Sequence, residues 1–176
     1  MLDLLLQLLA GWLLADFLSG LFHWIEDRLL FARDTWIGRL IVLPNRLHHR
    51  EPAAFLAGSF VDRNWTTWIL MVPAAALWLF IAGPSFILLG ALCGGLLVNE
   101  VHRLAHRSPE RGSWLRVLQE VGLVQSAAHH AGHHRTEDRR YCILTDWLNP
   151  VLDKIGVWHG LERLLVALRV PVSLGT

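Results

Sequence analysis

Two long apolar stretches dominate the chain, and both have the length of membrane-spanning helices. The first covers about residues 4–22, which at about 1.5 Å per residue is enough to cross a hydrocarbon layer of about 30 Å. It lacks the basic start and the small-residue exit of a signal peptide, and its helical pattern continues through residues 24–27. We therefore predict a retained membrane helix. Its one interruption, Asp16, should face the protein interior, because a carboxylate is costly at membrane depth.

The second apolar block covers about residues 65–98 and is too long for a single crossing. Its middle contains the strong turn signal Ala82-Gly83-Pro84-Ser85, so the block divides into two helices joined by a tight turn. Each helix is then slightly short for a full crossing. The hairpin is expected either to cross with little tilt or to enter the bilayer as a deep re-entrant hairpin.

The rest of the chain shows shorter amphipathic patterns. Ser113 is placed to cap a helix that extends to about residue 128, and a helix over about residues 150–170 carries apolar side chains on one side. We predict that both lie at the membrane interface. No repeat or long linker divides residues 1–176, which we expect to form a single domain. The predicted fold is an all-α integral membrane protein with about three transmembrane helices (one plus a hairpin), a cytoplasmic His-rich helical cap and amphipathic interfacial helices.

Composition and charge narrow the classes of function. Hydrophobic residues make up 53% of the chain and charged residues only 18%, against about 25% charged in an ordinary soluble domain. Sixteen basic and fifteen acidic residues leave a formal charge of +1, which excludes a general nucleic-acid binder. The two cysteines form neither a CxxC zinc motif nor a disulfide framework.

The basic residues predict an orientation in the membrane. Ten follow His102, and six lie between the first helix and the hairpin. With three crossings both regions lie on one side, which the positive-inside rule makes cytoplasmic. We therefore expect the N-terminus and the Gly83-Pro84 turn on the opposite side. The six are Arg28, Arg33, Arg39, Arg46, Arg50 and Arg63.

Nine of the ten histidines fall into four clusters, each at or just beyond the cytoplasmic end of a predicted helix. Residues four apart share a helix face, with Cβ atoms about 5–6 Å apart, which suits imidazoles that converge on one metal or on neighbouring metals. Packed neutral imidazoles also need donors, acceptors or a metal to satisfy them. The clusters are His23 beside Asp27, His48 with His49, His102 with His106, and the block His129, His130, His133 and His134.

The number of histidines predicts how many metals they hold. A structural zinc site is usually tetrahedral with four ligands, whereas nine histidines suffice for two ions with four or five ligands each. We therefore predict two metal ions. Imidazole suits zinc, copper, iron and nickel alike, so the ligand type does not identify the metal.

Four ordered motifs resemble one known family. They are Asp16-Phe17-x-x-Gly20-x-x-His23-Trp24-x-x-Asp27, Arg46-Leu47-His48-His49-Arg50-Glu51-Pro52, Asn99-Glu100-x-His102-x-x-Ala105-His106, and His129-His130-x-x-His133-His134 with Tyr141-Cys142, Asn149 and Leu152-Asp153. This set is similar to the Kua/CarF lipid-desaturase family, which includes plasmanylethanolamine desaturase and the plastid palmitate desaturase. The resemblance covers about residues 16–165.

The resemblance implies a membrane di-iron oxygenase that desaturates a lipid alkyl or acyl chain with O2. Electrons would come from a cytochrome b5-like or ferredoxin-like donor. The implied cofactor is two iron ions, with no catalytic residue beyond the metal ligands, although zinc can replace iron in purified protein because imidazole does not exclude it. The implied ligands are His23, His48, His49, His102, His106, His129, His130, His133 and His134.

Four further polar residues accompany these histidines. Asp27 lies one helical turn after a cluster histidine and is either a further ligand or an acceptor that fixes an imidazole tautomer. Asn99 either holds a water or orients a ligand, or is only a polar residue at a helix end. Asn149 and Asp153 lie four residues apart and either orient the histidine block or simply begin a helix.

Two other functions remain open at the level of sequence, a lipid hydroxylase and a histidine-based membrane metal transporter. A lipid hydroxylase would use the same di-iron chemistry and differ only after the first hydrogen is removed. A histidine-based membrane metal transporter would place polar groups near the bilayer midplane, where only Asp16 lies. A metal-dependent phosphohydrolase would need carboxylates inside the block 129–134, which has none. The lone His159 belongs to no cluster and stays outside the expected site.

Overall fold

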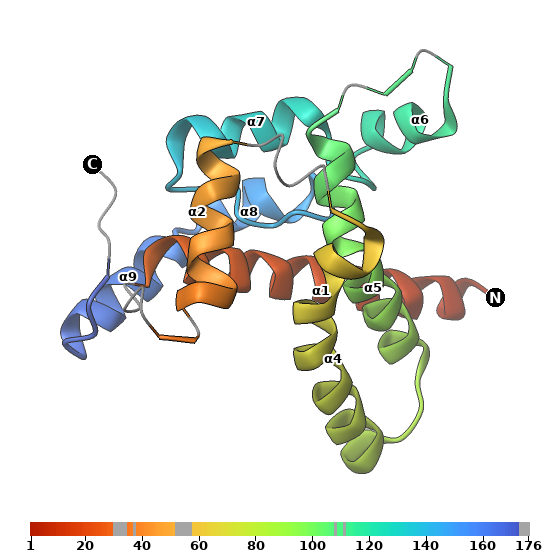
Figure 1. Ribbon diagram of the computed structural model, residues 1–176. Helices are drawn as coiled ribbons and strands as arrows, with labels where there is room; N and C mark the ends of the chain where they lie inside the picture. The colour runs from red at the N-terminus through yellow and green to blue at the C-terminus, as the bar shows by residue number, and fades with distance from the viewer. Residues whose placement is uncertain (30–34, 37, 52–57, 108, 111, 173–176) are drawn as a thin grey trace.

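The computed structural model describes residues 1–29, 35–36, 38–51, 58–107, 109–110 and 112–172, and within these ranges it is built from helices (Figure 1). This confirms the predicted all-α class. The one extended pairing among the described residues is an isolated bridge between Leu29 and Val172. In chain order the elements are α1 (Leu2–Arg28), the π-helical turn η1 (Gly38–Val42), α2 (Leu43–Arg50), α4 (Phe60–Ala82), α5 (Phe86–Ala105), α6 (Trp114–Glu120), α7 (Ala127–Thr136), α8 (Leu148–Lys154) and α9 (Val157–Ala167).

Three helices, α1, α4 and α5, are long and apolar enough to cross a membrane, as predicted. Helices α4 and α5 form the predicted hairpin, and the hydroxyl of Ser85 caps α5 by accepting from the amide of Leu88 at 3.1 Å. Each is longer than predicted, with 23 residues in α4 and 20 in α5. Twenty residues reach about 30 Å, so the shortfall expected from the sequence does not arise.

The hairpin carries its most exposed apolar side chains near the turn. Phe80 is 89% exposed and Ile81 is 73% exposed, and both lie at the end of α4. A soluble monomer rarely exposes apolar surface of this kind over a contiguous area, whereas lipid would cover it. The exposed surface therefore agrees with a hairpin that lies in a membrane.

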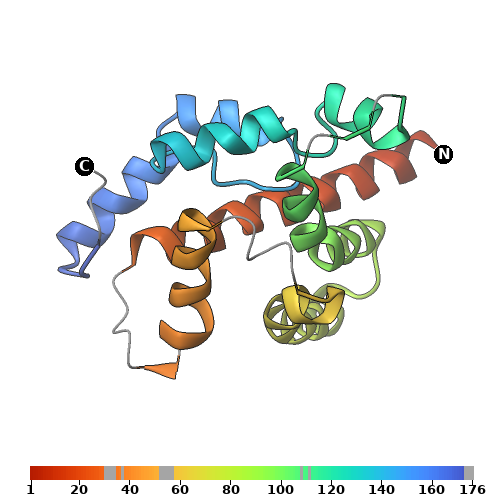
Figure 2. The same cartoon turned by 45° about the horizontal axis from the view of Figure 1, so that its top comes forward.

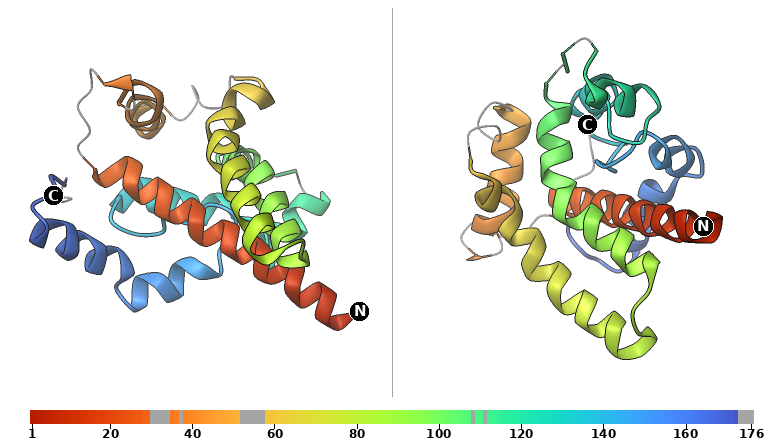
Figure 3. Two further views of the ribbon diagram at one scale, coloured as in Figure 1. Left: turned by 90° about the horizontal axis from the view of Figure 1, so that it is seen from below. Right: turned by 90° about the vertical axis from the view of Figure 1, so that its right-hand side faces the viewer.

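Helix α1 crosses α5 at a close contact between glycines. A Cβ atom on Gly11 would meet the backbone of Ile87, and one on Gly90 would meet the backbone of Leu8, so glycine lets the two backbones touch. The helices do not run side by side. In Figure 1 α1 extends across the hairpin, and in the right view of Figure 3 it points towards the viewer while the hairpin lies across the page. In one membrane they would therefore cross with different tilts.

Beyond this crossing, the C-terminal halves of α1 and α5 diverge. Helices α2 and α7 lie near the ends of both, as Figures 1 and 2 show, so that four helices surround one region. Helices α8 and α9 run along the C-terminal half of α1 (Figure 3, left), where Trp24, Tyr141 and Trp158 form a buried cluster. The fold thus brings the ends of α1, α2, α5 and α7 to a common place.

Asp16 faces the interior, as predicted, and is fully buried. Its carboxylate accepts hydrogen bonds from the backbone amides of Leu144 at 2.8 Å and Thr145 at 3.2 Å, and from the hydroxyl of Thr145 at 2.5 Å. The side chain therefore joins α1 to the segment that follows α7. This contact holds the chain after the histidine block against the first helix.

Two of the predicted helices are wrong in length, and a glycine with positive φ explains each. The helix expected over residues 113–128 is capped by Ser113 but ends at Glu120, because the chain turns at Gly122 with a φ of 75°. The helix expected over residues 150–170 divides into α8 and α9 at Gly156, whose φ is 69°. Both conformations lie in the left-handed region that glycine adopts without steric cost.

Candidate metal centre

Eight histidines and one carboxylate come together from four helix ends in two adjoining groups that could each hold a metal ion. Within each group the potential ligand atoms all lie within 4.8 Å of one another. The five-histidine group consists of His48, His102, His106, His130 and His134. The Asp27 group consists of His23, Asp27, His49 and His133.

The five-histidine group directs its Nε2 atoms towards a common centre. His48 comes from α2, His102 from α5 and His106 from the residue that caps α5, while α7 contributes His130 and His134. The Nε2 atom of His130 lies 3.0 Å from that of His102, 2.8 Å from that of His106 and 3.0 Å from that of His134. The Nε2 atoms of His106 and His48 are 3.2 Å apart.

These distances fit ligands around a cation better than a hydrogen-bond network. A neutral imidazole carries a single N–H, so the Nε2 atom of His130 cannot form a hydrogen bond with three other Nε2 atoms at once. At a metal–nitrogen distance of about 2.1 Å, neighbouring ligands lie about 3.0 Å apart in an octahedral arrangement and about 3.4 Å apart in a tetrahedral one. The four contacts of 2.8 to 3.2 Å are close to the separation of neighbouring ligands on one cation, and all five ligand atoms lie within 4.8 Å of one another.

The Asp27 group is built around a buried carboxylate on α1. The carboxylate oxygens of Asp27 lie 3.1 Å from Nε2 of His49, 3.3 Å from Nε2 of His133 and 3.9 Å from Nε2 of His23. The side-chain amide of Asn45 donates to Oδ1 of Asp27 at 2.6 Å and so fixes the carboxylate from the α2 side. Of the alternatives left open for Asp27, this placement is that of a potential ligand.

Backbone carbonyls fix the tautomers of two imidazoles in this group. The Nδ1–H of His133 donates to the carbonyl of Arg139 at 2.7 Å, and that of His23 donates to the carbonyl of Tyr141 at 3.2 Å. A carbonyl can only accept, so in the neutral imidazole each Nε2 atom presents its lone pair to the carboxylate. Among the described residues, these Nε2 atoms and Oδ2 of Asp27 are buried without a hydrogen-bond partner. A cation between them would satisfy all three atoms.

The two groups are direct neighbours. The ring centroids of His49 and His134 are 4.7 Å apart, and those of His23 and His102 are 5.8 Å apart, and each pair joins one group to the other. Two cations bound here would therefore be close enough to act on one small molecule. The structure thus offers two places for a cation, and the number of bound ions stays a prediction.

Burial keeps the imidazoles of the five-histidine group neutral. Burial, together with a smaller contribution from neighbouring histidines, lowers the pKa of His48 to about 2, of His134 to about 3 and of His106 to about 4. In the other group burial opposes the charged form of His49, but the carboxylates of Asp27 and Glu137 together outweigh burial and raise the pKa of His49 above its ordinary value. Neutral imidazoles have the free lone pair that metal binding requires.

His129 lies outside both groups, although the sequence placed it among the ligands. Its Nδ1 atom is 3.7 Å from the carboxylate of Asp146, and its Nε2 atom is buried without a hydrogen-bond partner among the described residues. On α7 the residues His130 and His134 turn to one group and His133 to the other. The His129 side chain instead approaches Asp146, in the chain before α8.

The accompanying polar residues take different places. Asn149 is fully buried and binds the backbone of Cys142, accepting from its amide at 2.9 Å and donating to its carbonyl at 2.7 Å. Asp153 accepts from the amide of Arg140 at 3.3 Å. Both therefore hold the segment whose carbonyls orient His23 and His133. The amide of Asn99 instead donates to the carbonyl of Arg63 at 2.7 Å, so it ties α5 to α4.

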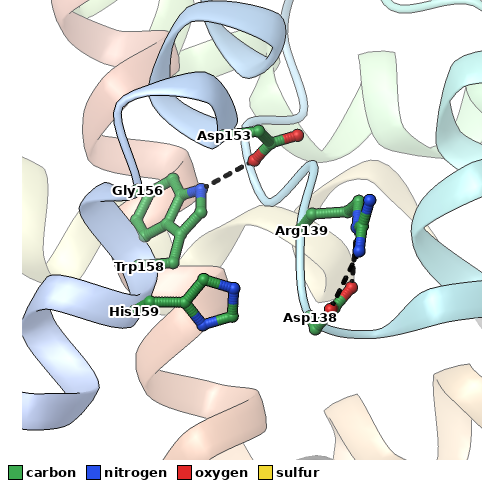
Figure 4. A pocket seen from close by; sticks show the side chains of 6 residues that line it. All are labelled: Asp138, Arg139, Asp153, Gly156, Trp158 and His159. Atoms are coloured by element: carbon green, nitrogen blue, oxygen red, sulfur yellow. Dashed lines mark hydrogen bonds and ion pairs between the residues drawn. The ribbon is translucent and has the colours of Figure 1, made fainter.

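His159 lies on α9 and lines a small cavity of about 130 Å³, together with Asp138, Arg139, Asp153 and Trp158 (Figure 4). The indole of Trp158 donates to Asp153 at 3.2 Å, and His159 contacts Glu162 at 3.1 Å. His159 is therefore separate from the two metal groups, as the sequence predicted.

Three contributors to the site were missed in the sequence. Asn45 orients Asp27, and the carbonyls of Arg139 and Tyr141 orient imidazoles. A backbone carbonyl has no sequence signature, because every residue carries one. Asn45 lies three residues before His48, and this helical spacing was the one signal that could have identified it.

Comparison with known proteins finds related sequences over most of the chain. The sequence profile of the lipid desaturase domain matches residues 12–170. The chain is 32% identical over 172 residues to a probable fatty acid desaturase of Acanthamoeba polyphaga mimivirus. This match covers 93% of this chain and 82% of that protein. It is 30% identical to the plasmanylethanolamine desaturase of Myxococcus xanthus and to plasmanylethanolamine desaturase 1 of Mus musculus. These matches cover 92% and 93% of this chain but only 60% and 65% of the two relatives, respectively. No solved structure matches the chain significantly.

Proposed function

The chain belongs to the lipid desaturase family, and from this we propose that it introduces a double bond into the hydrocarbon chain of a membrane lipid. The observation that carries the proposal is the pair of adjoining ligand groups at the ends of apolar helices. The reaction uses O2, which accepts four electrons and leaves as two water molecules. Two of these electrons come with two protons from neighbouring C–H bonds of the lipid, and a donor protein supplies the other two, with two protons from solvent.

We propose that each group holds one iron ion. Bound iron supplies the oxidising power that an unactivated C–H bond requires, which acid–base side chains do not provide. The chain's own residues bind the ions with neutral imidazoles, balance part of their charge with Asp27, and exclude water by burial. Zinc fits imidazole ligands as well and can replace iron in purified protein.

The substrate class follows from the relatives and from the position of the site. The relatives are named for plasmanylethanolamine and for fatty acids, so we propose an alkyl ether chain or an acyl chain as the substrate. The ligands on α1 and α5 lie at the C-terminal ends of two apolar helices. A lipid chain would therefore reach the ligand groups directly from the membrane.

We place the two ligand groups on the cytoplasmic side of the membrane. All sixteen basic residues lie in the regions that three crossings would put on that side. A cytochrome b5-like or ferredoxin-like protein would deliver its electrons there. The donor is part of the proposal because the lipid supplies only half of the electrons that O2 takes up.

Lipid mass spectrometry tests this function. A host strain that lacks the gene is compared with strains complemented by the wild type, by His102→Ala or by His159→Ala. We expect the wild type and His159→Ala to restore a lipid lighter by two hydrogens, and His102→Ala to restore none. A product heavier by one oxygen would identify a hydroxylase instead. Unchanged lipids in the complemented wild type during aerobic growth would contradict both reactions.

A further inference from the structure

One short segment supports the Asp27 group from behind. The carbonyls of Arg139 and Tyr141 accept the Nδ1–H groups of His133 and His23, so the position of this segment decides where both Nε2 atoms point. The ring of Tyr141 also packs against both imidazoles, with centroids 5.1 Å from His133 and 6.0 Å from His23. The segment is irregular, and Arg140 has a φ of 61°. Such a segment needs contacts outside itself to hold a defined position.

A buried chain of charged and polar side chains supplies such a contact. The hydroxyl of Tyr141 accepts from Nε of Arg28 at 2.8 Å and donates to the carbonyl of Glu137 at 2.7 Å. Nε of Arg28 lies 3.1 Å from the carboxylate of Glu162 on α9. Tyr141 is 0% exposed, Arg28 4% and Glu162 9%, so these contacts are shielded from water. Glu162 therefore holds Arg28, and Arg28 holds the residue whose carbonyl orients His23.

The contacts of Tyr141 favour one metal group over the other. Its ring and its carbonyl both contact ligands of the Asp27 group. The five-histidine group takes His102 and His106 from the end of α5, which is fixed separately by its crossing with α1 and by its pairing with α4. A change at Tyr141 or Glu162 should therefore act on one metal and spare the other.

We propose that Arg28, Tyr141 and Glu162 are positioning residues that tighten metal binding at the Asp27 group. The inference rests on the proposed function, since it requires that both groups hold a metal. Through this chain of contacts, the C-terminal helix α9 sets the affinity of a metal that it does not touch. Loss of a residue that orients a metal ligand typically weakens binding about 10- to 100-fold. We expect about 10-fold, because Glu162 and the hydroxyl of Tyr141 act through the backbone.

Metal release by a chelator tests the inference. The full chain in lipid nanodiscs is loaded with Co²⁺, whose absorption reports the ligand geometry, and release is followed after addition of EDTA. His133→Ala and His134→Ala identify which kinetic phase belongs to the Asp27 group and which to the five-histidine group. Tyr141→Phe removes only a hydroxyl and Glu162→Gln only a charge. Glu120→Gln is the matched control, because it breaks an exposed ion pair on α6 in which the nitrogen and oxygen atoms lie 2.7 Å apart.

We expect Tyr141→Phe and Glu162→Gln to accelerate about 10-fold the phase that His133→Ala removes, with a changed cobalt spectrum in that phase only. The double variant should be no worse than the stronger single one, because both act through Arg28. Equal acceleration of both phases would indicate general loosening and overturn the inference, as would no change in either. A wild type that holds fewer than two ions would contradict the proposed metal centre itself, and the inference would then fall with it.

Discussion

Replacement of Asp16 by alanine should strongly destabilise the protein, although Asp16 lies outside the two metal groups. The carboxylate is fully buried and accepts three hydrogen bonds, from the amides of Leu144 and Thr145 and from the hydroxyl of Thr145. Alanine removes both acceptor oxygens, and with them all three hydrogen bonds, and leaves two backbone amides buried without a partner. Asparagine keeps one side-chain oxygen in place for these two amides.

The size of the effect follows from the cost of unsatisfied polar groups. A buried donor that loses its acceptor costs about 1–3 kcal/mol, so two amides cost about 2–6 kcal/mol. We expect a loss of about 4 kcal/mol in the free energy of unfolding for Asp16→Ala. Asp16→Asn should lose about 1 kcal/mol, because only the hydrogen bond from the hydroxyl of Thr145 changes.

Unfolding of the metal-free protein by SDS in mixed micelles measures these differences. Asp3→Ala is the control, because Asp3 is exposed on the same helix and accepts from Gln7 at 2.8 Å. It should leave the free energy of unfolding nearly unchanged. If Asp16→Ala and Asp16→Asn lost the same free energy, the reasoning from unsatisfied amides would be refuted.

Three further predictions concern topology, packing and pH. A reporter fused after Ser85 should lie on the side opposite to a C-terminal reporter, and a shared side would favour a re-entrant hairpin. Gly20→Ala should speed metal release from the Asp27 group, because the new Cβ would lie 2.6 Å from Sγ and 2.9 Å from the amide nitrogen of Cys142. An unchanged rate of metal release to a chelator would contradict this. The metal-free protein should lose stability as the pH falls below about 6.5, because the unfolded chain then binds protons at histidines such as His48, whose folded pKa is about 2. Melting temperatures measured down to about pH 5 test this, and a melting temperature that does not change over this range would contradict it.

The apolar helices and the histidine site could be predicted because both depend on residue type and helical period. His102 with His106, and His130 with His134, share a group as their spacing of four residues suggests. The same spacing also pairs His129 with His133, yet only His133 joins a group. Spacing shows which side chains share a helix face, but the neighbouring helices decide which metal that face meets.

The remaining features depend on contacts that no local pattern contains. The breaks at Gly122 and Gly156 depend on positive φ values, which glycine permits but does not require. Asn99 lies three residues before His102 on the same helix, but its side-chain amide donates to the carbonyl of Arg63 on α4. The carbonyls that orient the Asp27 group belong to an irregular segment after α7, whose path is set by distant residues such as Asp16.

Iron content combined with X-ray absorption spectroscopy tests the central claim most directly. Protein loaded with Fe²⁺ without oxygen should contain about two irons per chain, with nitrogen-rich coordination of five or six ligands at the five-histidine group. Asp27→Ala and His102→Ala should each retain about one iron, because they remove ligands from different groups. A single ion in a tetrahedral site, or full iron content in both variants, would contradict the account.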